Sequence, residues 1–490
     1  MALLPPLRFG TDGWRGVIAR DFTFDRVRLA ARAVARALGT TRAGRERLLV
    51  AVGYDTRFLS ARFAQAVADA LSTEHVDVRL TTSFLPTPAL AWAVTLLGAQ
   101  GGIIITASHN PPSYNGLKVR AADGGPASPA LTAQIEAEVE RLADRRNVRH
   151  DPIPPAPVEH AAAGRIELFD PLPRYRQRLG SLVDLDRIGR SRIHVVVDPM
   201  YGASRGLLAG LLQERGVETH EIRGEANPWF GGLPPEPLPD HLGELAERVR
   251  GLSARWRIGL ALDGDGDRLA AIDEGGSYVS PHQIFALLLQ HLVTRRGFSG
   301  TVVKTVSTTM MIDRLATSYG LRLAVTPIGF KHVAEVIRRE PVLMGGEESG
   351  GIGVAGHIPE RDGILSALLL LECLAVEGKP LGALIDRLEA EVGRHRYRRL
   401  DLPAPGWGDR RELERRILGN VPASIDRWRI AEVQSLDGVK MIGEDGSWLL
   451  IRPSGTEPVL RLYAEAPTDD QVSRLLDWAK AYVRGLREDV

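Results

Sequence analysis

The chain has 490 residues, 44% of them hydrophobic and 25% charged, which is typical of a soluble globular protein. This length exceeds what one hydrophobic core usually accommodates and predicts three or four domains. Because 62 Lys and Arg residues balance 61 Asp and Glu residues, no global charge would attract nucleic acid or an anionic membrane.

The signals for cellular location all point to a cytoplasmic protein. The single cysteine, Cys373, excludes an internal disulfide framework and fits a reducing compartment. The N-terminus, MALLPPLRFG, lacks the basic region and long apolar core of a secretory signal. The most apolar run, residues 364–376, contains Ser366 and Glu372 and is too short to span a bilayer. We therefore expect no membrane partner.

Hydrophobic periodicity predicts a series of α/β units. After FGTDGWRG, four apolar residues share one face of an expected helix: Val27, Ala30, Val34 and Leu38. Three later segments each have the pattern of a buried strand, a polar or glycine-containing loop and an amphipathic helix. They begin near Leu48, Ile193 and Thr301. This recurrence suggests three α/β domains of similar plan.

Composition shifts divide the chain into four expected domains, covering residues 1–150, 165–273, 274–394 and 395–490. The proline- and alanine-rich segment 151–164, DPIPPAPVEHAAAG, is the expected linker after the first domain. The last domain combines strand-like runs at 446–452 and 459–464 with a helix over 468–486. It is therefore expected to be a small α+β domain.

The segment 101–118, GGIIITASHNPPSYNGLK, places a serine just beyond a predicted strand. Residues 103–106 are apolar and β-branched, with glycines before them and prolines after, which favours a buried strand. Ligands bind beyond the carboxyl ends of strands in open α/β sheets, so Ser108, with His109 and Lys118 close by, is a candidate nucleophile. The alternative is an ordinary turn, because Ser, Asn, Pro and Gly are common turn formers.

LALDGDGDR places three carboxylates at alternate positions after an apolar run. Asp263, Asp265 and Asp267 can converge on one hard cation because alternate residues of an extended chain face the same side. A calcium loop is excluded because Arg268 stands where that motif requires glycine. The sequence favours a Mg²⁺ site over a solvated acidic turn.

Two further loops have the chemistry to recognise a sugar phosphate. The IRPSGTEP loop suits a phosphate dianion, and a turn is its alternative; its candidate residues are Arg452, Ser454, Gly455 and Thr456, with Arg461 as a second charge. In GGEESGG, the acceptors and hydroxyl of Glu347, Glu348 and Ser349 suit vicinal sugar hydroxyls. Adjacent acidic residues are otherwise often simply solvent-exposed.

Two other patterns suggest different functions. Residues 351–356 spell G-x-G-x-x-G, but HisIleProGlu follows instead of a helix, so a dinucleotide site is not expected. Residues 202–206 spell G-x-S-x-G between a strand and a helix, which makes Ser204 the candidate nucleophile of a serine hydrolase. Pro199 loosens the sharp turn that such a nucleophile needs, so this hypothesis ranks second.

TASHNPPSYNGLK, DGDGDR, GGEESGG and RPSGTEP, in that order, closely resemble the motifs of the α-D-phosphohexomutase family, which includes phosphoglucomutases and phosphomannomutases. The resemblance covers nearly the whole chain. It implies three similar mixed α/β domains and a smaller C-terminal α+β domain around a central cleft, with one motif from each domain.

The resemblance implies transfer of a phosphoryl group between positions 1 and 6 of a hexose phosphate. Ser108 would be carried as phosphoserine, and its phosphate would bind Mg²⁺ together with Asp263, Asp265 and Asp267. The intermediate would be a hexose 1,6-bisphosphate, which also serves as activator. The expected partner is therefore a small sugar phosphate, bound to a monomer or small homo-oligomer.

The resemblance also assigns the remaining roles. The non-reacting phosphate would be held by Arg452, Ser454, Gly455 and Thr456, and the sugar hydroxyls by Glu347 and Ser349. Positive residues around the reacting phosphate would be Arg15, Lys118 and Arg268. His109, Lys118 or Lys331, the last in TPIGFKHV, would transfer protons.

Two positions bear on the preferred sugar. Glu348 is similar to the residue of glucose-type members, whereas Gly351 stands where some members have histidine. A sugar contact is therefore either missing or supplied by His357. We predict a phosphoglucomutase with mannose phosphate as the second substrate. An inactive sugar-phosphate-binding protein is disfavoured because each motif keeps its reactive residues.

Overall fold

The computed structural model describes residues 7–10, 12–40, 47–144, 163–403, 410–454 and 459–488. Two members of the expected phosphate loop, Gly455 and Thr456, lie outside these residues. So does nearly all of the expected linker, of which only residues 163 and 164 are described.

The first domain is a six-stranded mixed sheet. Its strand order is β1 (Trp14–Val17), β5 (Tyr114–Ala121), β4 (Gly101–Ile105), β2 (Leu49–Tyr54), β3 (Asp77–Thr81) and β6 (Ile166–Phe169). The first two strands run antiparallel to their neighbours, and the other pairs are parallel.

Helices cover both faces of this first sheet. On one face, α1 (Phe24–Thr40), α2 (Ser60–Thr73) and α4 (Pro129–Asp144) share a hydrophobic core. On the other face, α3 (Thr87–Leu97) packs toward the second domain. All four apolar residues that predicted the first helix are buried, which confirms that prediction.

The second and third domains repeat this mixed α/β plan. The second sheet has the order β11 (Tyr278–Val279), β10 (Leu269–Ile272), β9 (Arg257–Leu262), β7 (His194–Asp198) and β8 (Thr219–Glu221). Its helices are α5 (Leu172–Leu182), α6 (Leu185–Arg190), α7 (Leu207–Gln213) and α8 (Gly243–Gly251), with 3₁₀ turns at Phe230–Gly232 and Pro239–His241.

The third sheet has the order β13 (Leu323–Thr326), β12 (Thr301–Thr305), β14 (Val342–Gly346) and β15 (Ile352–Val354). Its helices are α9 (Pro281–Thr294), α10 (Met311–Ser318), α11 (Phe330–Arg339), α12 (Gly363–Glu377) and α13 (Leu381–Val392). The three predicted strand–loop–helix units are therefore present as β2–α2, β7–α7 and β12–α10.

Two short strands lie on the far side of the domain limits expected from the sequence. Strand β6, inside the range assigned to the second domain, pairs with β3 of the first sheet. Strand β11, assigned to the third domain, pairs with β10 of the second sheet. The first and second sheets thus each take an edge strand from beyond the predicted boundary. Strand pairing defines the extent of a sheet, whereas the boundaries were predicted from composition.

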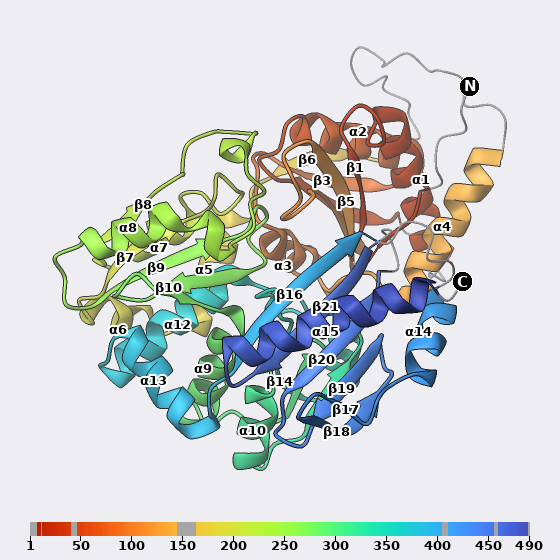
Figure 1. Cartoon of the computed structure of the whole chain (residues 1–490). Helices are drawn as coiled ribbons and strands as arrows, with labels where there is room; N and C mark the ends of the chain where they lie inside the picture. The colour runs from red at the N-terminus through yellow and green to blue at the C-terminus, as the bar shows by residue number, and fades with distance from the viewer. Residues whose placement is uncertain are drawn as a thin grey trace.

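The C-terminal domain is an antiparallel sheet covered by helices. Its order is β16 (Arg396–Pro403), β21 (Val459–Ala466), β20 (Trp448–Pro453), β19 (Val439–Gly443), β18 (Trp428–Gln434) and β17 (Ser424–Ile425). Helices α14 (Arg410–Gly419) and α15 (Asp469–Glu488) pack on this sheet, forming the predicted α+β domain (Figure 1).

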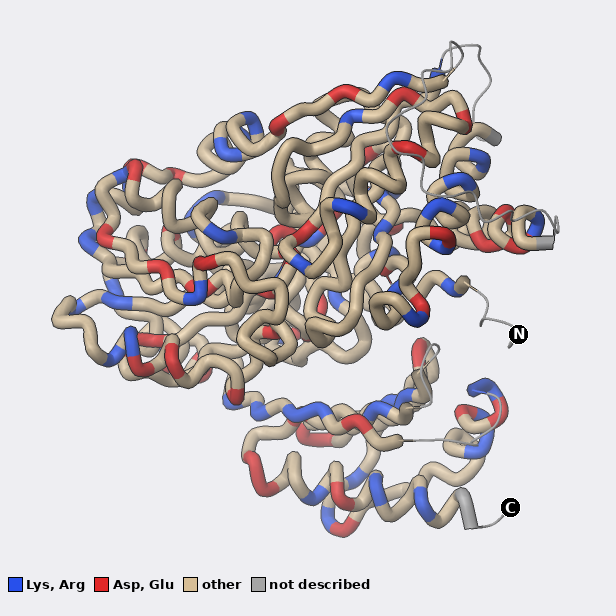
Figure 2. Tube along the Cα trace, turned by 90° about the horizontal axis from the view of Figure 1, so that it is seen from above, with Lys and Arg blue, Asp and Glu red and all other residues tan. Residues whose placement is uncertain are grey.

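One hydrophobic core joins the first three domains. Helix α12, buried over most of its length, packs on α6 of the second domain and on α9 of its own. Cys373 lies in this core. Seen from above, the C-terminal domain forms a distinct lobe (Figure 2), and it packs on Val306 of the third domain through Trp448, Leu450 and Tyr463. No helix in the described ranges is both long and apolar enough to cross a membrane.

Candidate active site

The loop after β4 brings Ser108 to the acidic motif of the second domain. Ser108 lies three residues beyond the strand, has a left-handed φ of 52° and is 1% exposed. Its amide donates to Thr106 Oγ1 at 2.9 Å, and its hydroxyl donates to Asp263 Oδ2 at 2.8 Å. Two motifs that are distant in sequence therefore share one site.

The acidic motif forms a tight loop between β9 and β10, with all three carboxylates buried. One oxygen each of Asp263, Asp265 and Asp267 lies within 4.8 Å of the others. Gly264 makes the approach to the serine loop possible, because a Cβ there would lie 2.4 Å from the Ser108 carbonyl oxygen.

This carboxylate cluster suits a divalent cation. Burial, together with the neighbouring Asp267 and Asp265 carboxylates, raises the pKa of Asp263 well above its ordinary value. Asp265 Oδ1 and Asp267 Oδ1 are buried and have no hydrogen-bond partner among the described residues. Buried carboxylate oxygens normally have partners, so these two are open ligand positions for a hard cation such as Mg²⁺.

Lys118 lies at the centre of the carboxylates. It projects from β5, and its Nζ lies 2.7 Å from Asp265, 3.0 Å from Asp267 and 3.0 Å from Asp12. Burial works against its charge, but these three carboxylates raise the pKa of Lys118 above its ordinary value. Lys118 is therefore held as an ammonium group, which makes it an unsuitable proton acceptor.

His109 is better suited than Lys118 to accept a proton, because its side chain is held in the neutral form. Its Nδ1 lies 3.3 Å from Ser108 Oγ. Burial, followed by the charges of Arg268 and Arg15, lowers the pKa of His109 well below its ordinary value. These two arginines are oriented by neighbours, Arg15 by Asn110 and Arg268 by Glu236. The serine loop thus combines a neutral imidazole with cations that suit an anionic ligand.

The GGEESGG loop follows β14 and contributes a buried carboxylate. Glu347 is 6% exposed and accepts a hydrogen bond from Arg361 Nη1 at 3.2 Å. Glu348 accepts from Ser307 Oγ at 2.7 Å, and Ser349 is half-buried. The loop therefore offers both carboxylate and hydroxyl groups beside the acidic motif.

Arg361 links the motifs of three domains. Its guanidinium contacts Asp12 of the first domain, Asp267 of the second at 2.9 Å and Glu347 of the third at 3.2 Å. Gly351 leaves room for it, because a Cβ at residue 351 would lie 2.1 Å from Arg361 Cδ. Arg361 thus fills the space that a side chain at residue 351 would occupy.

The suggestion that His357 supplies a sugar contact is wrong. Its side chain is 1% exposed, and its Nε2 lies 3.0 Å from Asp362 Oδ2. The same carboxylate oxygen accepts the Tyr175 hydroxyl at 2.6 Å. His357 is therefore enclosed between two domains and points into a buried polar cluster, not toward a ligand.

The described part of the RPSGTEP loop begins with Arg452, and Arg461 lies on the adjacent strand. Arg452 of β20 and Arg461 of β21 are directly opposite in the strand register. Arg452 is 5% exposed and has its Nε 3.0 Å from Asp437, while Arg461 Nε lies 3.6 Å from Asp401. Ser454 donates its amide to the Val459 carbonyl at 2.8 Å.

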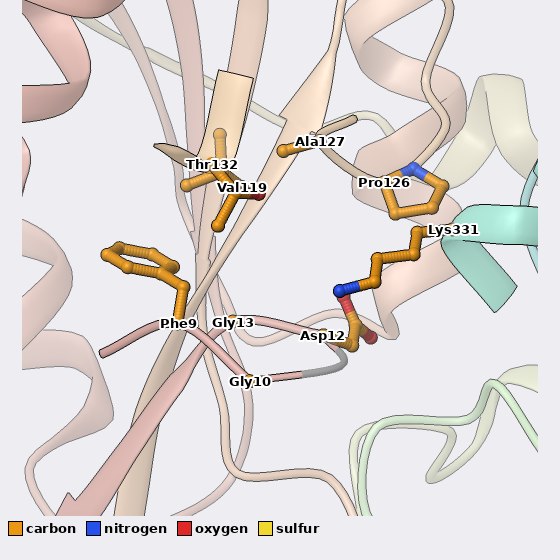
Figure 3. A pocket seen from close by; sticks show the side chains of 9 residues that line it. All are labelled: Phe9, Gly10, Asp12, Gly13, Val119, Pro126, Ala127, Thr132 and Lys331. Atoms are coloured by element: carbon orange, nitrogen blue, oxygen red, sulfur yellow. The ribbon is translucent and has the colours of Figure 1, made fainter. Parts of the chain in front are cut away.

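Lys331 begins α11 and reaches across to the first domain. It lines a small cavity together with Gly10, Asp12 and Gly13. Figure 3 shows its amino group pointing toward the Asp12 carboxylate. Lys331 therefore faces Asp12 across this cavity, and Asp12 is also the carboxylate that contacts Lys118 and Arg361.

Ser204, the alternative nucleophile, lacks the surroundings of a hydrolase serine. It is 0% exposed, and its Oγ has no hydrogen-bond partner in the described part of the chain. A Cβ at Gly266 would lie 2.3 Å from this Oγ, so Ser204 packs directly under the acidic loop. No histidine lies within hydrogen-bond distance of this Oγ in the described part of the chain, so Ser204 lacks the base that nucleophilic catalysis requires.

Several residues of this cluster carry no signal in the sequence. Thr87 donates its hydroxyl to Asp265 Oδ2 at 2.5 Å, and Asp12 accepts from three cations. Neither residue lies in a spacing that predicts chemistry. For Asp12, only its place in the glycine-rich FGTDGWRG offered a hint.

Glu347 provides a pH-dependent contribution to stability. Burial, partly offset by Arg361, raises the pKa of Glu347 to about 7. Because the folded pKa exceeds the ordinary value of 4.5, this contribution is fully present below pH 4.5 and is lost as pH rises through about 7. The slope approaches about 1.4 kcal/mol per pH unit. Urea unfolding of wild type and Glu347→Gln at pH 5 and 8 measures it, and an equal pH dependence in both proteins would contradict it.

Comparison with protein families identifies all four domains. The models for phosphoglucomutase/phosphomannomutase domains I, II, III and the C-terminal domain match residues 6–146, 173–276, 280–392 and 415–478. A Thermococcus kodakarensis phosphoglucomutase/phosphomannomutase is 32% identical over 96% of both chains. A Sulfurisphaera tokodaii phosphoglucosamine/phosphogalactosamine mutase is also 32% identical, covering 97% of this chain and 99% of its own.

Solved structures show the same four-domain fold. A crystal structure described as a phosphomannomutase from Thermus thermophilus superposes with a TM-score of 0.83 at 35% identity, covering 98% of this chain and 100% of its own. A phosphoglucomutase/phosphomannomutase family protein from Burkholderia thailandensis has a TM-score of 0.80 at 23% identity, covering 99% and 98%.

Proposed function

Because the chain belongs to the phosphoglucomutase/phosphomannomutase family of phosphohexomutases, we propose that it interconverts hexose 1-phosphate and hexose 6-phosphate through a phosphorylated Ser108. The observation that carries this proposal is the hydrogen bond from Ser108 Oγ to Asp263 at 2.8 Å, beside His109, on which the charges of Arg268, Arg15 and Lys118 act. The same arrangement suits a phosphate on Ser108, whose charge the cations would balance.

The reaction proceeds by two transfers. In the first, the bond between phosphorus and Ser108 Oγ breaks as a substrate hydroxyl attacks phosphorus, and the hydroxyl proton passes to His109. The product is a sugar bisphosphate. After this intermediate reverses its orientation, Ser108 Oγ attacks its other phosphate, and the departing sugar oxygen takes the proton back from His109. This restores the phosphoserine and releases the isomerised monophosphate. Arg15 and Arg268 stabilise the charge on the transferring group.

Mg²⁺ is the proposed cofactor, held by Asp263, Asp265, Asp267 and the phosphate on Ser108. It would neutralise negative charge on the transferring phosphoryl group. The two unpartnered carboxylate oxygens of the acidic loop support this assignment. Lys118, bonded to two of the same carboxylates, keeps them oriented toward the serine loop.

The substrate is held at its far end by the other two motifs. We assign the sugar hydroxyls to Glu347 and Ser349, and the non-reacting phosphate to the RPSGTEP loop: Arg452, Ser454, Gly455, Thr456 and Arg461. The pairing of Arg452 with Arg461 in the strand register supports the phosphate assignment, since two arginines at neighbouring positions suit a dianion. Lys331, beside Asp12, is assigned to proton movement around the sugar.

We propose glucose phosphate as the preferred substrate and mannose phosphate as the second. Glu348, similar to the residue of glucose-type members, supports this order; it accepts from Ser307 and Thr305. Glucosamine phosphate is the main alternative substrate. The phosphoglucosamine/phosphogalactosamine mutase from Sulfurisphaera tokodaii is as similar to this chain, at 32% identity, as the Thermococcus phosphoglucomutase/phosphomannomutase.

Initial rates with the 1-phosphates of glucose, mannose and glucosamine test both the proposed mutase activity and the proposed substrate preference. Each assay contains Mg²⁺ and a trace of the matching 1,6-bisphosphate. We expect formation of the 6-phosphate, fastest for glucose, and loss of turnover when a chelator removes Mg²⁺. A higher rate with glucosamine would overturn the substrate assignment alone. No turnover with any of the three would overturn the mutase proposal in favour of a silent binding protein.

A further inference from the structure

Arg57 lies beneath the serine loop and binds its backbone at four points. It follows β2, and its side chain is 0% exposed. Nη2 donates to the carbonyls of Ser108 and Asn110, both at 2.7 Å. Nη1 donates to the carbonyls of Pro111 at 2.9 Å and Tyr114 at 3.0 Å. The four Nη hydrogens of the guanidinium are thus matched by four carbonyl oxygens of one loop.

The guanidinium is itself fixed from two domains. On its remaining side, Nε lies 3.2 Å from Asp55 Oδ2, and the other Asp55 oxygen accepts the Ser60 hydroxyl at 2.7 Å. The ring of Phe230, from the second domain, lies over the guanidinium at 4.9 Å. Arg57 is therefore a rigid platform, since its guanidinium group can neither move nor rotate out of its plane without breaking these contacts.

This platform accounts for the unusual backbone of Ser108. A φ of 52° is uncommon for a residue other than glycine and persists only where the surroundings impose it. Here the Ser108 carbonyl is bound to Arg57 and its amide to Thr106 Oγ1. With both ends of the residue fixed, Cβ and Oγ face Asp263 of the acidic loop.

We propose that Arg57 is a positioning residue for phosphoryl transfer, holding the backbone of residues 108–114 so that Ser108 Oγ faces the acidic loop. The inference rests on the proposed role of Ser108 as phosphoryl carrier. Such a carrier must donate one phosphoryl group and accept another in each turnover, both from the same position. A small displacement of Oγ therefore slows both transfers. Arg57 acts through the loop: in the described part of the chain, its guanidinium bonds the four loop carbonyls and pairs with Asp55.

The test is Arg57→Lys, which keeps the charge but cannot form the four-carbonyl fork. We expect kcat to fall about 100-fold, the usual effect of displacing a reacting atom, here Ser108 Oγ, by about 1 Å. KM should be unchanged, because the sugar and phosphate loops belong to other domains. The matched control is Arg257→Lys. Arg257 is a partly buried arginine that donates to the carbonyls of Leu252, Ala254 and Glu274, away from the site. This variant should keep the wild-type kcat.

Two readouts separate positioning from general stability. Hydrogen exchange at the amides of Asn110 and Tyr114, which close turns within the loop, should accelerate in Arg57→Lys while the β2 amides stay protected. Added methylguanidinium should restore part of the kcat of Arg57→Ala but not that of Ser108→Ala. An Arg57→Lys enzyme with wild-type kcat, or with unchanged exchange in the loop, would overturn the inference. Failure of the proposed function is distinct, because wild type itself would then show no turnover.

Discussion

Replacing Ser108 by Ala is expected to lower mutase turnover by roughly 10⁴-fold or more, as loss of a covalent nucleophile does in other enzymes. No neighbouring hydroxyl can take its place, because Thr87 is bonded to Asp265 and Thr106 accepts the Ser108 amide. The fold should persist, since alanine tolerates the left-handed backbone about as well as serine and the loop stays bound to Arg57.

A coupled assay for glucose 6-phosphate measures the loss, and mass spectrometry locates the phosphate. Wild-type protein incubated with glucose 1,6-bisphosphate should gain one phosphate on the peptide that contains Ser108. The Ala variant should gain none. Ser204→Ala is the control, because it removes the other candidate nucleophile; it should retain turnover. Retained turnover in Ser108→Ala would remove Ser108 from its proposed role. Organophosphonate labelling of wild type that disappears in Ser204→Ala would favour the hydrolase.

The sequence was most informative where a motif follows its own strand. Ser108 comes after β4, and Asp263 comes after β9. In both cases a short apolar run predicted the strand, and the residues beyond it predicted the chemistry. Local patterns of this kind depend on backbone periodicity and side-chain type alone, so they can be recognised without knowledge of the tertiary arrangement. The three strand–loop–helix units were predictable for the same reason.

The connections between motifs were not predictable in this way. Asp12 and Arg361 are 349 residues apart in sequence, and only the packing of the first and third domains brings them together. The error on His357 has the same origin. Glycine in place of histidine at residue 351 suggested that His357 supplies the missing contact, but Tyr175, from another domain, and Asp362 enclose it. Long-range polar pairing decides such cases, and single-sequence patterns do not contain it.

Arg361→Leu is expected to lower the free energy of unfolding by about 3–5 kcal/mol, the usual effect of removing one partner from a buried ionic cluster. Arg361 is paired with the carboxylates of Asp12, Asp267, Glu347 and Glu360. Burial opposes its charge, but these carboxylates raise the pKa of Arg361 well above its ordinary value. Leucine would leave four buried carboxylates with one cation fewer, and they come from three domains.

Urea unfolding followed by tryptophan fluorescence measures this loss, taken at the first transition because a four-domain chain need not unfold in one step. Arg141→Leu is the control. Arg141 has a 48% exposed side chain paired with Glu138, so its replacement should change stability by less than about 1 kcal/mol. Equal effects of the two substitutions would contradict the idea that Arg361 joins the domains. Arg361→Lys should recover only part of the loss, because an ammonium group cannot replace a guanidinium that reaches several carboxylates at once. The same contacts hold the acidic loop, the sugar loop and Asp12 in one arrangement, so a reduced kcat should accompany the lower stability even in the fraction that remains folded.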